Sequence, residues 1–279
     1  MTKTHEERIA WFRDARLGMF IHWGVYSVLE KGEWGMNCDT ISIPDYERVA
    51  DEFQAGNLDV DAWVRAAKAA GFRYAVLTTK HHDGFCLWNT RTTDWNSVVR
   101  GPRRDVVREF VEACRRHGMR IGLYWSWVDW HYPEWAKRFV WTDLAQWRKS
   151  FDDAAEHRKL VDFLHAQVRE LLTDYGPVDI LWFDGGFLTA EEYRSREMVD
   201  MVRQLQPDIL INDRSGLYEE RDFGCPEGQI PTEAPTRPWE LCHCTQSAWG
   251  CEGDEEGLYY PAQDLLALLC DSVALGGNV

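Results

Sequence analysis

The feature that most constrains this chain is a repeated unit in which an amphipathic helix ends at glycine or proline and an apolar strand follows. Apolar residues recur at helical spacing over residues 61–70, Gly71 comes next, and the apolar run 72–79 follows directly. Because a helix separates consecutive strands, we expect the strands to run parallel with the helices as crossovers. The same order predicts further helices over 105–117, 155–175, 191–206 and 262–275, and further strands over 17–21, 119–125, 177–184 and 208–211.

Polar or aromatic side chains follow five of these strands, which favours a barrel over an open sheet. A barrel collects groups from all its strand ends in one pocket, whereas an open sheet binds ligands at one switch point. The G-x-G-x-x-G turn of an open nucleotide-binding sheet is absent after the first strand, where His22 stands. The sequence therefore predicts an α/β fold, a (β/α)8-like barrel of the TIM type, as one catalytic domain over residues 1–279. The strand-end groups are His22, His81, His82, Tyr124, Asp184 and the run 212–214.

The formal net charge of −15 limits the partners of this chain. Nucleic acid and anionic membrane surfaces would repel it, so we expect neither as a partner, and a small neutral ligand fits better. No run reaches the roughly 18 apolar residues of a membrane span. The first residues show no basic segment followed by an apolar one, so no secretory signal is visible and we expect a cytoplasmic protein.

The chain has eight cysteines, and several of them fall in apolar helix or strand patterns, as Cys114 does. Without a secretory signal, reduced thiols are expected rather than disulfides. A zinc cluster of Cys242, His243, Cys244 and Cys251 is disfavoured, because the C-x-C spacing does not match the paired spacing of structural zinc sites.

Fifteen tryptophans are many for this length, and several stand near predicted strand ends or in the long connections 25–57, 127–153 and 215–260. Each one alone is expected to be a packing residue. As a group they suit a pocket for a neutral ligand with apolar faces, such as a sugar, which offers little charge to bind. The tryptophans in these places are Trp23, Trp34, Trp88, Trp125, Trp127, Trp130, Trp182 and Trp249.

Asp184 ends an apolar strand beside Trp182 and Phe183, and two glycines follow it. Barrel enzymes place catalytic groups at the carboxyl ends of strands, and the aromatic neighbours would hold this carboxylate rigidly. It could act as a nucleophile, a general base or a metal ligand. Nothing in the sequence resembles a serine or cysteine nucleophile elbow, so Asp184 is the central candidate.

Two adjacent histidines, His81 and His82, follow the second strand. Strand alternation predicts that one faces the barrel axis and the other faces outward, unless a bulge intervenes. A metal site of His22, His81 and Asp184 is an alternative use of these side chains. The H-x-H pair that many barrel metallohydrolases carry on a first strand is missing, so this alternative is less favoured.

A series of short motifs adds a resemblance that covers about residues 8–278. The motifs are Gly18-Met-Phe-Ile-His-Trp-Gly24, Glu33-Trp34, Leu77-Thr-Thr-Lys-His-His-Asp-Gly-Phe85-Cys-Leu-Trp88, Trp182-Phe-Asp-Gly185, Asp222-Phe-Gly-Cys-Pro-Glu227, Trp239-Glu240-Leu-Cys242 and Trp249-Gly250. In content and order they resemble the alpha-L-fucosidase family of retaining glycoside hydrolases. The resemblance implies a barrel enzyme that removes alpha-L-fucose from glycans, with no metal and no organic cofactor.

The resemblance also implies roles for single residues. Asp184 matches the nucleophile, which forms a covalent bond to the anomeric carbon. Trp34 and Trp249 match aromatic residues that enclose the C6 methyl group of fucose. The full set that matches the substrate pocket is His22, Glu33, Trp34, His81, His82, Tyr124, Trp182, Arg214 and Trp249.

The acid/base residue is less sharply indicated, because it comes from a loop that varies within the family. Glu227 is the first candidate, although the family more often has threonine where Cys225 stands. Glu240 is the second candidate, with Glu233 or an acid within 252–256 behind it. A double displacement needs the acid/base and the nucleophile about 5–5.5 Å apart.

The family pattern continues past Gly277-Asn278 into an apolar strand and a C-terminal β-sandwich, whereas this sequence stops at Val279. We therefore expect an incomplete last barrel strand with an exposed sheet edge, no β-sandwich, and self-association into homo-oligomers. Two other classes stay open. One is an inactive sugar-binding protein on the same fold, and the other is a metal-dependent barrel hydrolase.

Overall fold

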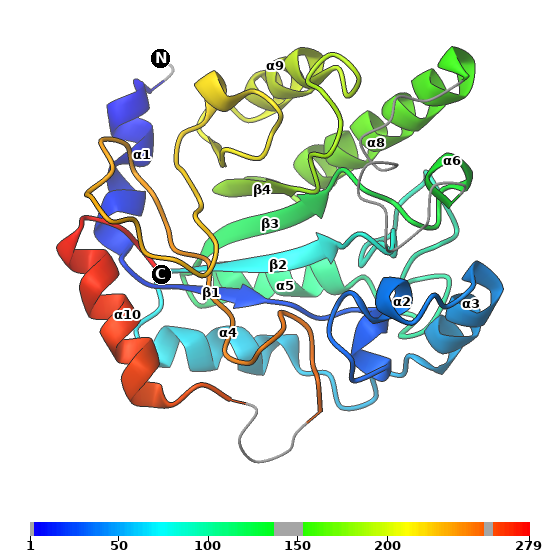
Figure 1. The fold of residues 1–279 in the computed structure, drawn as a ribbon, viewed down its shortest axis with the longest axis horizontal. Helices are drawn as coiled ribbons and strands as arrows, with labels where there is room; N and C mark the ends of the chain where they lie inside the picture. Colours follow the sequence, from blue (N-terminus) through cyan, green and yellow to red (C-terminus); the bar gives the residue numbers. More distant parts are fainter. Residues whose placement is uncertain (1–2, 137–152, 254–258) are drawn as a thin grey trace.

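The structure is a computed structural model that describes residues 3–136, 153–253 and 259–279 (Figure 1). Its centre is a parallel sheet of five strands in the order β1-β2-β3-β4-β5, so each strand pairs with the next one along the chain. This confirms the predicted α/β class and the order of its units. The strands are β1 (Gly18–Ile21), β2 (Tyr74–Lys80), β3 (Arg120–Ser126), β4 (Ile180–Asp184) and β5 (Leu210–Ile211).

The predicted crossover helices are present, and aspartates begin three of them. The side chains of Asp59, Asp105 and Asp153 accept hydrogen bonds from backbone N–H groups in the first turns of α4, α5 and α8. The helix predicted over 191–206 begins later, at Ser195, because a turn ending at Arg194 precedes it. The crossover helices are α4 (Val60–Ala69), α5 (Val106–Arg116), α8 (Ala154–Asp174) and α9 (Ser195–Leu205), and α10 (Ala262–Ala274) follows as the last helix.

No helix was predicted in the connection 25–57, and the structure has three helical segments there. They are η1 (Val25–Val28), α2 (Gly35–Cys38) and α3 (Ile43–Glu52). Ser42 caps α3, and Ile43, Tyr46, Val49 and Ala50 pack toward the core from it, so the sequence carries signals of this helix that the prediction did not use. The structure adds three more elements without a sequence prediction: α1 (His5–Ala15), α6 (Pro133–Ala136) and η2 (Tyr218–Glu220). None of the described helices has the length and apolar character needed to cross a membrane.

Regular strand pairing within the described residues stops at β5, and single parallel bridges continue from there. They join Asn212 to Phe223, Gly224 to Trp239, and Glu240 to Asn278. The Val279 carbonyl then accepts the N–H of Gly18 at 2.8 Å, at the start of β1. Figure 1 accordingly shows the C-terminus beside β1. Residues 278–279 therefore occupy the place where an open sheet edge was expected, and β1 is hydrogen-bonded there.

Successive side chains along the strands pack alternately into two apolar clusters, and this alternation determines which side chains reach the site. Odd positions of β2 and β3, such as Leu77 and Leu123, pack in the larger cluster with the crossover helices. Tyr124 and Trp182 lie in the smaller cluster, together with Phe12 of α1. The side chains of this smaller cluster lead toward the carboxyl ends of the strands, where the candidate site lies.

Candidate active site

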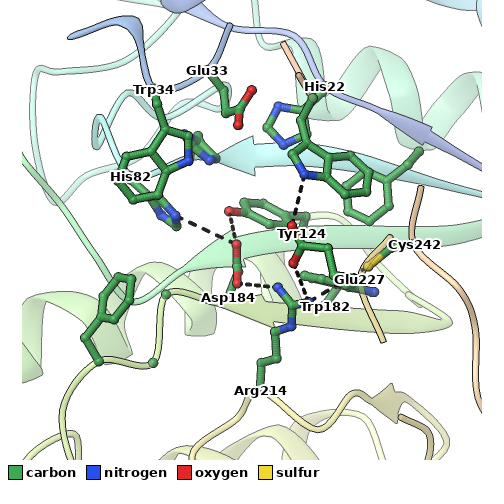
Figure 2. A pocket seen from close by; sticks show the side chains of 16 residues that line it. His22, Glu33, Trp34, His82, Tyr124, Trp182, Asp184, Arg214, Glu227 and Cys242 are labelled. Carbon is green, nitrogen blue, oxygen red and sulfur yellow. Dashed lines mark hydrogen bonds and ion pairs between the residues drawn. The ribbon is translucent and has the colours of Figure 1, made fainter. Parts of the chain in front are cut away.

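A cavity of about 280 Å³ opens where the strands end (Figure 2). Asp184, the first acid/base candidate Glu227 and all the residues predicted for the substrate pocket line it. Groups from β1, β2, β3 and β4 meet there with groups from the loops after β5, as expected for a barrel-like sheet. The lining residues are Phe20, His22, Glu33, Trp34, His81, His82, Tyr124, Trp182, Asp184, Gly185, Gly186, Phe187, Arg214, Glu227, Cys242 and Trp249.

Asp184 is the last residue of β4, and its side chain is 20% exposed. Its Oδ2 accepts the hydroxyl of Tyr124 at 2.9 Å, and its Oδ1 accepts Arg214 Nη1 at 2.9 Å. Tyr124 pairs in register with Trp182, two positions before Asp184, so Tyr124 and Asp184 share one face of the sheet. Gly185 then turns the chain with φ of 72°, a conformation that favours glycine.

The surroundings of Asp184 favour its ionised form. Burial raises the pKa of its carboxyl, but His82, Arg214 and Tyr124 outweigh burial and lower that pKa below its ordinary value. His82 is itself neutral near pH 7, so the guanidinium of Arg214 supplies the positive charge there. Asp184 is therefore a carboxylate at neutral pH, as a nucleophile requires.

The three histidines of the cavity are neutral bases. Burial lowers the pKa of His22 to about 3 and that of His82 to about 4, and it lowers the pKa of His81 well below its ordinary value. Tyr26 contacts Nδ1 of His22 at 3.0 Å, and Ser126 contacts Nδ1 of His82 at 2.6 Å. These contacts orient the rings, while Nε2 of His82 lies 3.8 Å from Asp184.

Strand alternation predicted opposite directions for His81 and His82, yet both line the cavity. The pairing of β2 with β3 shifts register between Thr78 and Lys80, and the strand ends at Lys80. The irregularity breaks the alternation, and the two rings stack with centroids 4.1 Å apart. Nδ1 of His81 is buried and has no hydrogen-bond partner among the residues that the structure describes.

Glu227 lies at the cavity mouth with its side chain 49% exposed. Its Oε2 accepts Arg214 Nη2 at 2.8 Å, and its Oε1 accepts Trp249 Nε1 at 3.1 Å. Arg214 also lies over the Trp182 ring, 4.8 Å from its centroid. One guanidinium thus binds both Glu227 and Asp184 through its two terminal nitrogens (Figure 2).

Glu240, the second acid/base candidate, lies apart from the cavity and is 4% exposed. It accepts the Tyr74 hydroxyl at 2.5 Å and Trp182 Nε1 at 2.7 Å, and burial raises the pKa of its carboxyl. Glu233 is exposed and does not line the cavity. Glu252 does not line it either, and the acids at 254–256 lie outside the described residues.

The tryptophans divide into two groups. Trp34, Trp182 and Trp249 line the cavity, while the other predicted tryptophans do not line it. Sequence reasoning missed the cavity residues Phe20 and Phe187, together with Cys242. The alternation of β1 signals Phe20, because it lies two positions before His22. The remaining tryptophans named above are Trp23, which packs against Phe53, and the fully buried Trp88, Trp125, Trp127 and Trp130.

The cysteine-rich run does not form a metal centre in the part of the chain that the structure describes. No group of three or more His, Cys, Asp or Glu side chains among those residues is placed to hold a metal ion. Cys242 is a free thiol on the cavity wall, and its Sγ lies 3.4 Å from the Pro226 carbonyl oxygen. His243 Nδ1 instead contacts the backbone carbonyl of Cys244 at 2.7 Å.

Comparison with known proteins decides the family. The family model described as Alpha-L-fucosidase matches residues 2–279. The chain belongs to the alpha-L-fucosidase family. It is 30% identical to tissue alpha-L-fucosidase of Bos taurus, over 96% of this chain and 61% of that protein. It is also 30% identical to plasma alpha-L-fucosidase of Rattus norvegicus, over 97% of this chain and 62% of that protein. The chain therefore spans less than two thirds of the length of these relatives.

Solved structures agree with this family. Alpha-L-fucosidase isoenzyme 1 from Paenibacillus thiaminolyticus matches with a TM-score of 0.89 and 37% identity, over 98% of this chain and 69% of that chain. Unliganded alpha-L-fucosidase AlfC from Lactobacillus casei matches with a TM-score of 0.84 and 29% identity, over 97% of this chain and 89% of that chain. The arrangement of strands and helices described above is thus shared with fucosidase structures.

Proposed function

We propose that this protein hydrolyses alpha-L-fucosides with retention of configuration, with Asp184 as nucleophile and Glu227 as acid/base. The observation that carries the proposal is the guanidinium of Arg214, which binds both carboxylates at one cavity. Two carboxyl groups that contact the same guanidinium suit a double displacement, in which they stand about 5–5.5 Å apart. AlfC has been solved in complex with alpha-L-fucose product and, as a variant, with Fuca(1,6)GlcNAc, which supports a fucosylated glycan as substrate.

The proposed reaction has two steps. In the first, a carboxylate oxygen of Asp184 attacks the anomeric carbon, the glycosidic C–O bond breaks, and Glu227 gives its proton to the leaving oxygen. In the second, Glu227 takes a proton from water, whose oxygen attacks the anomeric carbon. The ester bond to Asp184 then breaks and the carboxylate is restored. No cofactor enters either step.

The cavity supports a single sugar ring as the bound group. Its volume, about 280 Å³, is at the small end for ligand sites. Neutral imidazoles of His22, His81 and His82 can exchange hydrogen bonds with hydroxyl groups without a charged partner. The indoles of Trp34 and Trp249 supply apolar area, which a 6-deoxy sugar needs around its methyl group.

Covalent trapping tests the proposal. Incubation with a 2-deoxy-2-fluoro-fucosyl fluoride, followed by peptide mapping, should place the sugar on Asp184. The Asp184→Gly variant should lose about 10³-fold or more of its turnover of an aryl alpha-L-fucoside. Turnover of the wild type should persist after chelation with EDTA. Label on another residue, or loss of turnover on chelation, would contradict the proposal.

A further inference from the structure

The loop that carries Trp249 is anchored to the loop that carries Glu33. The N–H of Gly250 donates to Glu33 Oε2 at 2.8 Å, and the N–H of Gly32 donates to the Cys251 carbonyl at 3.0 Å. Glu33 is only 5% exposed, so this contact is sheltered from water. The residues on both sides of Gly250 are thereby held in place.

The close approach of the two loops requires glycine at position 250. A Cβ added to Gly250 would lie 2.7 Å from the backbone nitrogen of Glu33 and 3.0 Å from Cδ2 of Tyr26. The first contact is with backbone, which cannot move aside as a flexible side chain can. Any larger residue at 250 would therefore displace the loop and the neighbouring Trp249.

Trp249 is directed at the carboxylate proposed as acid/base. Its Nε1 donates to Glu227 Oε1 at 3.1 Å, while Arg214 donates to the other oxygen at 2.8 Å. A half-exposed glutamate has free rotamers, and two donors on two oxygens restrict them. From this geometry we infer that Trp249 is a positioning residue, which holds Glu227 in the orientation for proton transfer. The inference rests on the proposed function.

The variant Trp249→Phe tests this role, because phenylalanine keeps an aromatic wall but removes the N–H. With a poor leaving group, such as a methyl or unsubstituted aryl alpha-L-fucoside, we expect kcat to fall about 10-fold. With 2,4-dinitrophenyl alpha-L-fucoside, whose leaving group needs little protonation, the fall in kcat should be several-fold smaller than with the poor leaving group.

The double variant Trp249→Phe/Glu227→Ala distinguishes two roles of Trp249. In one it positions Glu227, and in the other it only forms part of the cavity wall. If Trp249 acts through Glu227, the double variant should be no slower than Glu227→Ala alone. Losses that multiply, or an equal loss for all leaving groups, would each overturn the inference. Absence of leaving-group dependence in Glu227→Ala itself would contradict the proposed function, and this inference with it.

Gly250→Ala supplies a second route if the phenylalanine variant does not fold. It keeps the indole but displaces the loop, so it should reproduce the selective loss on poor leaving groups. Circular dichroism should show the wild-type secondary structure, and the clash should lower the melting temperature. A folded Gly250→Ala variant that hydrolyses all fucosides at the wild-type rate would overturn the inference.

Discussion

Two glutamates of this protein have similar partners and very different surroundings. Glu227 and Glu240 each accept an indole N–H, from Trp249 and from Trp182 respectively. Glu227 is half exposed at the cavity, beside the guanidinium of Arg214. Glu240 is buried outside the cavity, and the hydroxyl of Tyr74 is its second hydrogen-bond donor. The hydrogen bonds alone therefore do not distinguish a reacting group from a packing group.

The difference lies in access and in charge. Of the two glutamates, only Glu227 lines the cavity and shares Arg214 with Asp184. Glu240 has no opening to the cavity, and burial raises the pKa of its carboxyl. The comparison predicts that Glu227 matters for rate and Glu240 for stability, and four changes test it.

The largest expected effect is on the rate of Glu227→Ala. Removing a general acid should lower kcat/KM for fucosides with poor leaving groups by about 10²–10⁴-fold, and much less for activated aryl fucosides. Azide should restore part of the lost turnover, because it needs no general base to attack the glycosyl-enzyme. Steady-state kinetics across a series of aryl fucosides measures this. An equal rate for all leaving groups would assign the acid to another residue.

The next effect is on the stability of Glu240→Ala. The variant leaves the Tyr74 hydroxyl and the Trp182 N–H buried without an acceptor and opens a small void. We expect the free energy of unfolding to fall by about 2–5 kcal/mol, measured by urea denaturation. Glu227→Ala is the matched control and should change that free energy by less than about 1 kcal/mol. A loss of the same size in both variants would remove the distinction.

A smaller effect concerns pH. The raised pKa of Glu240 means that the folded state binds its proton more tightly than the unfolded state does. Its contribution to stability is therefore greatest below the unfolded pKa, about 4.3, and declines as pH rises through the folded pKa. Glu240→Gln does not titrate, so its unfolding free energy should improve relative to the wild type between pH 4 and pH 7. A difference that stays constant with pH would refute this.

The smallest expected effect is on the stability of Glu227→Gln. Glutamine keeps the shape of an exposed side chain, so the free energy of unfolding should stay within about 0.5 kcal/mol of the wild type. Its turnover of poor substrates should nevertheless fall as in Glu227→Ala, because an amide cannot transfer the proton. Differential scanning calorimetry together with the kinetic assay tests both statements. A large loss of stability would indicate a structural role at the cavity mouth.

The barrel units were predictable because their helices and strands bury broad apolar faces with clear periods. The helix α3 was not predicted, although Ser42 at its start and the helical spacing of Tyr46 and Ala50 signal it. Motif order indicated which residues gather at the cavity. Strand alternation could not indicate that His81 and His82 both face it, as the motif resemblance implied, because that depends on a register shift in β2. Nor could motif order separate Glu227 from Glu240, since burial emerges only from the packed chain.

The shared guanidinium of Arg214 has a consequence for timing in the proposed reaction. In the free site its two terminal nitrogens contact one carboxyl group each. Once the sugar is esterified to Asp184, that carboxyl group is no longer an anion, while Glu227 has just given up its proton. The same guanidinium therefore faces a charged nucleophile before the first step and a charged base after it.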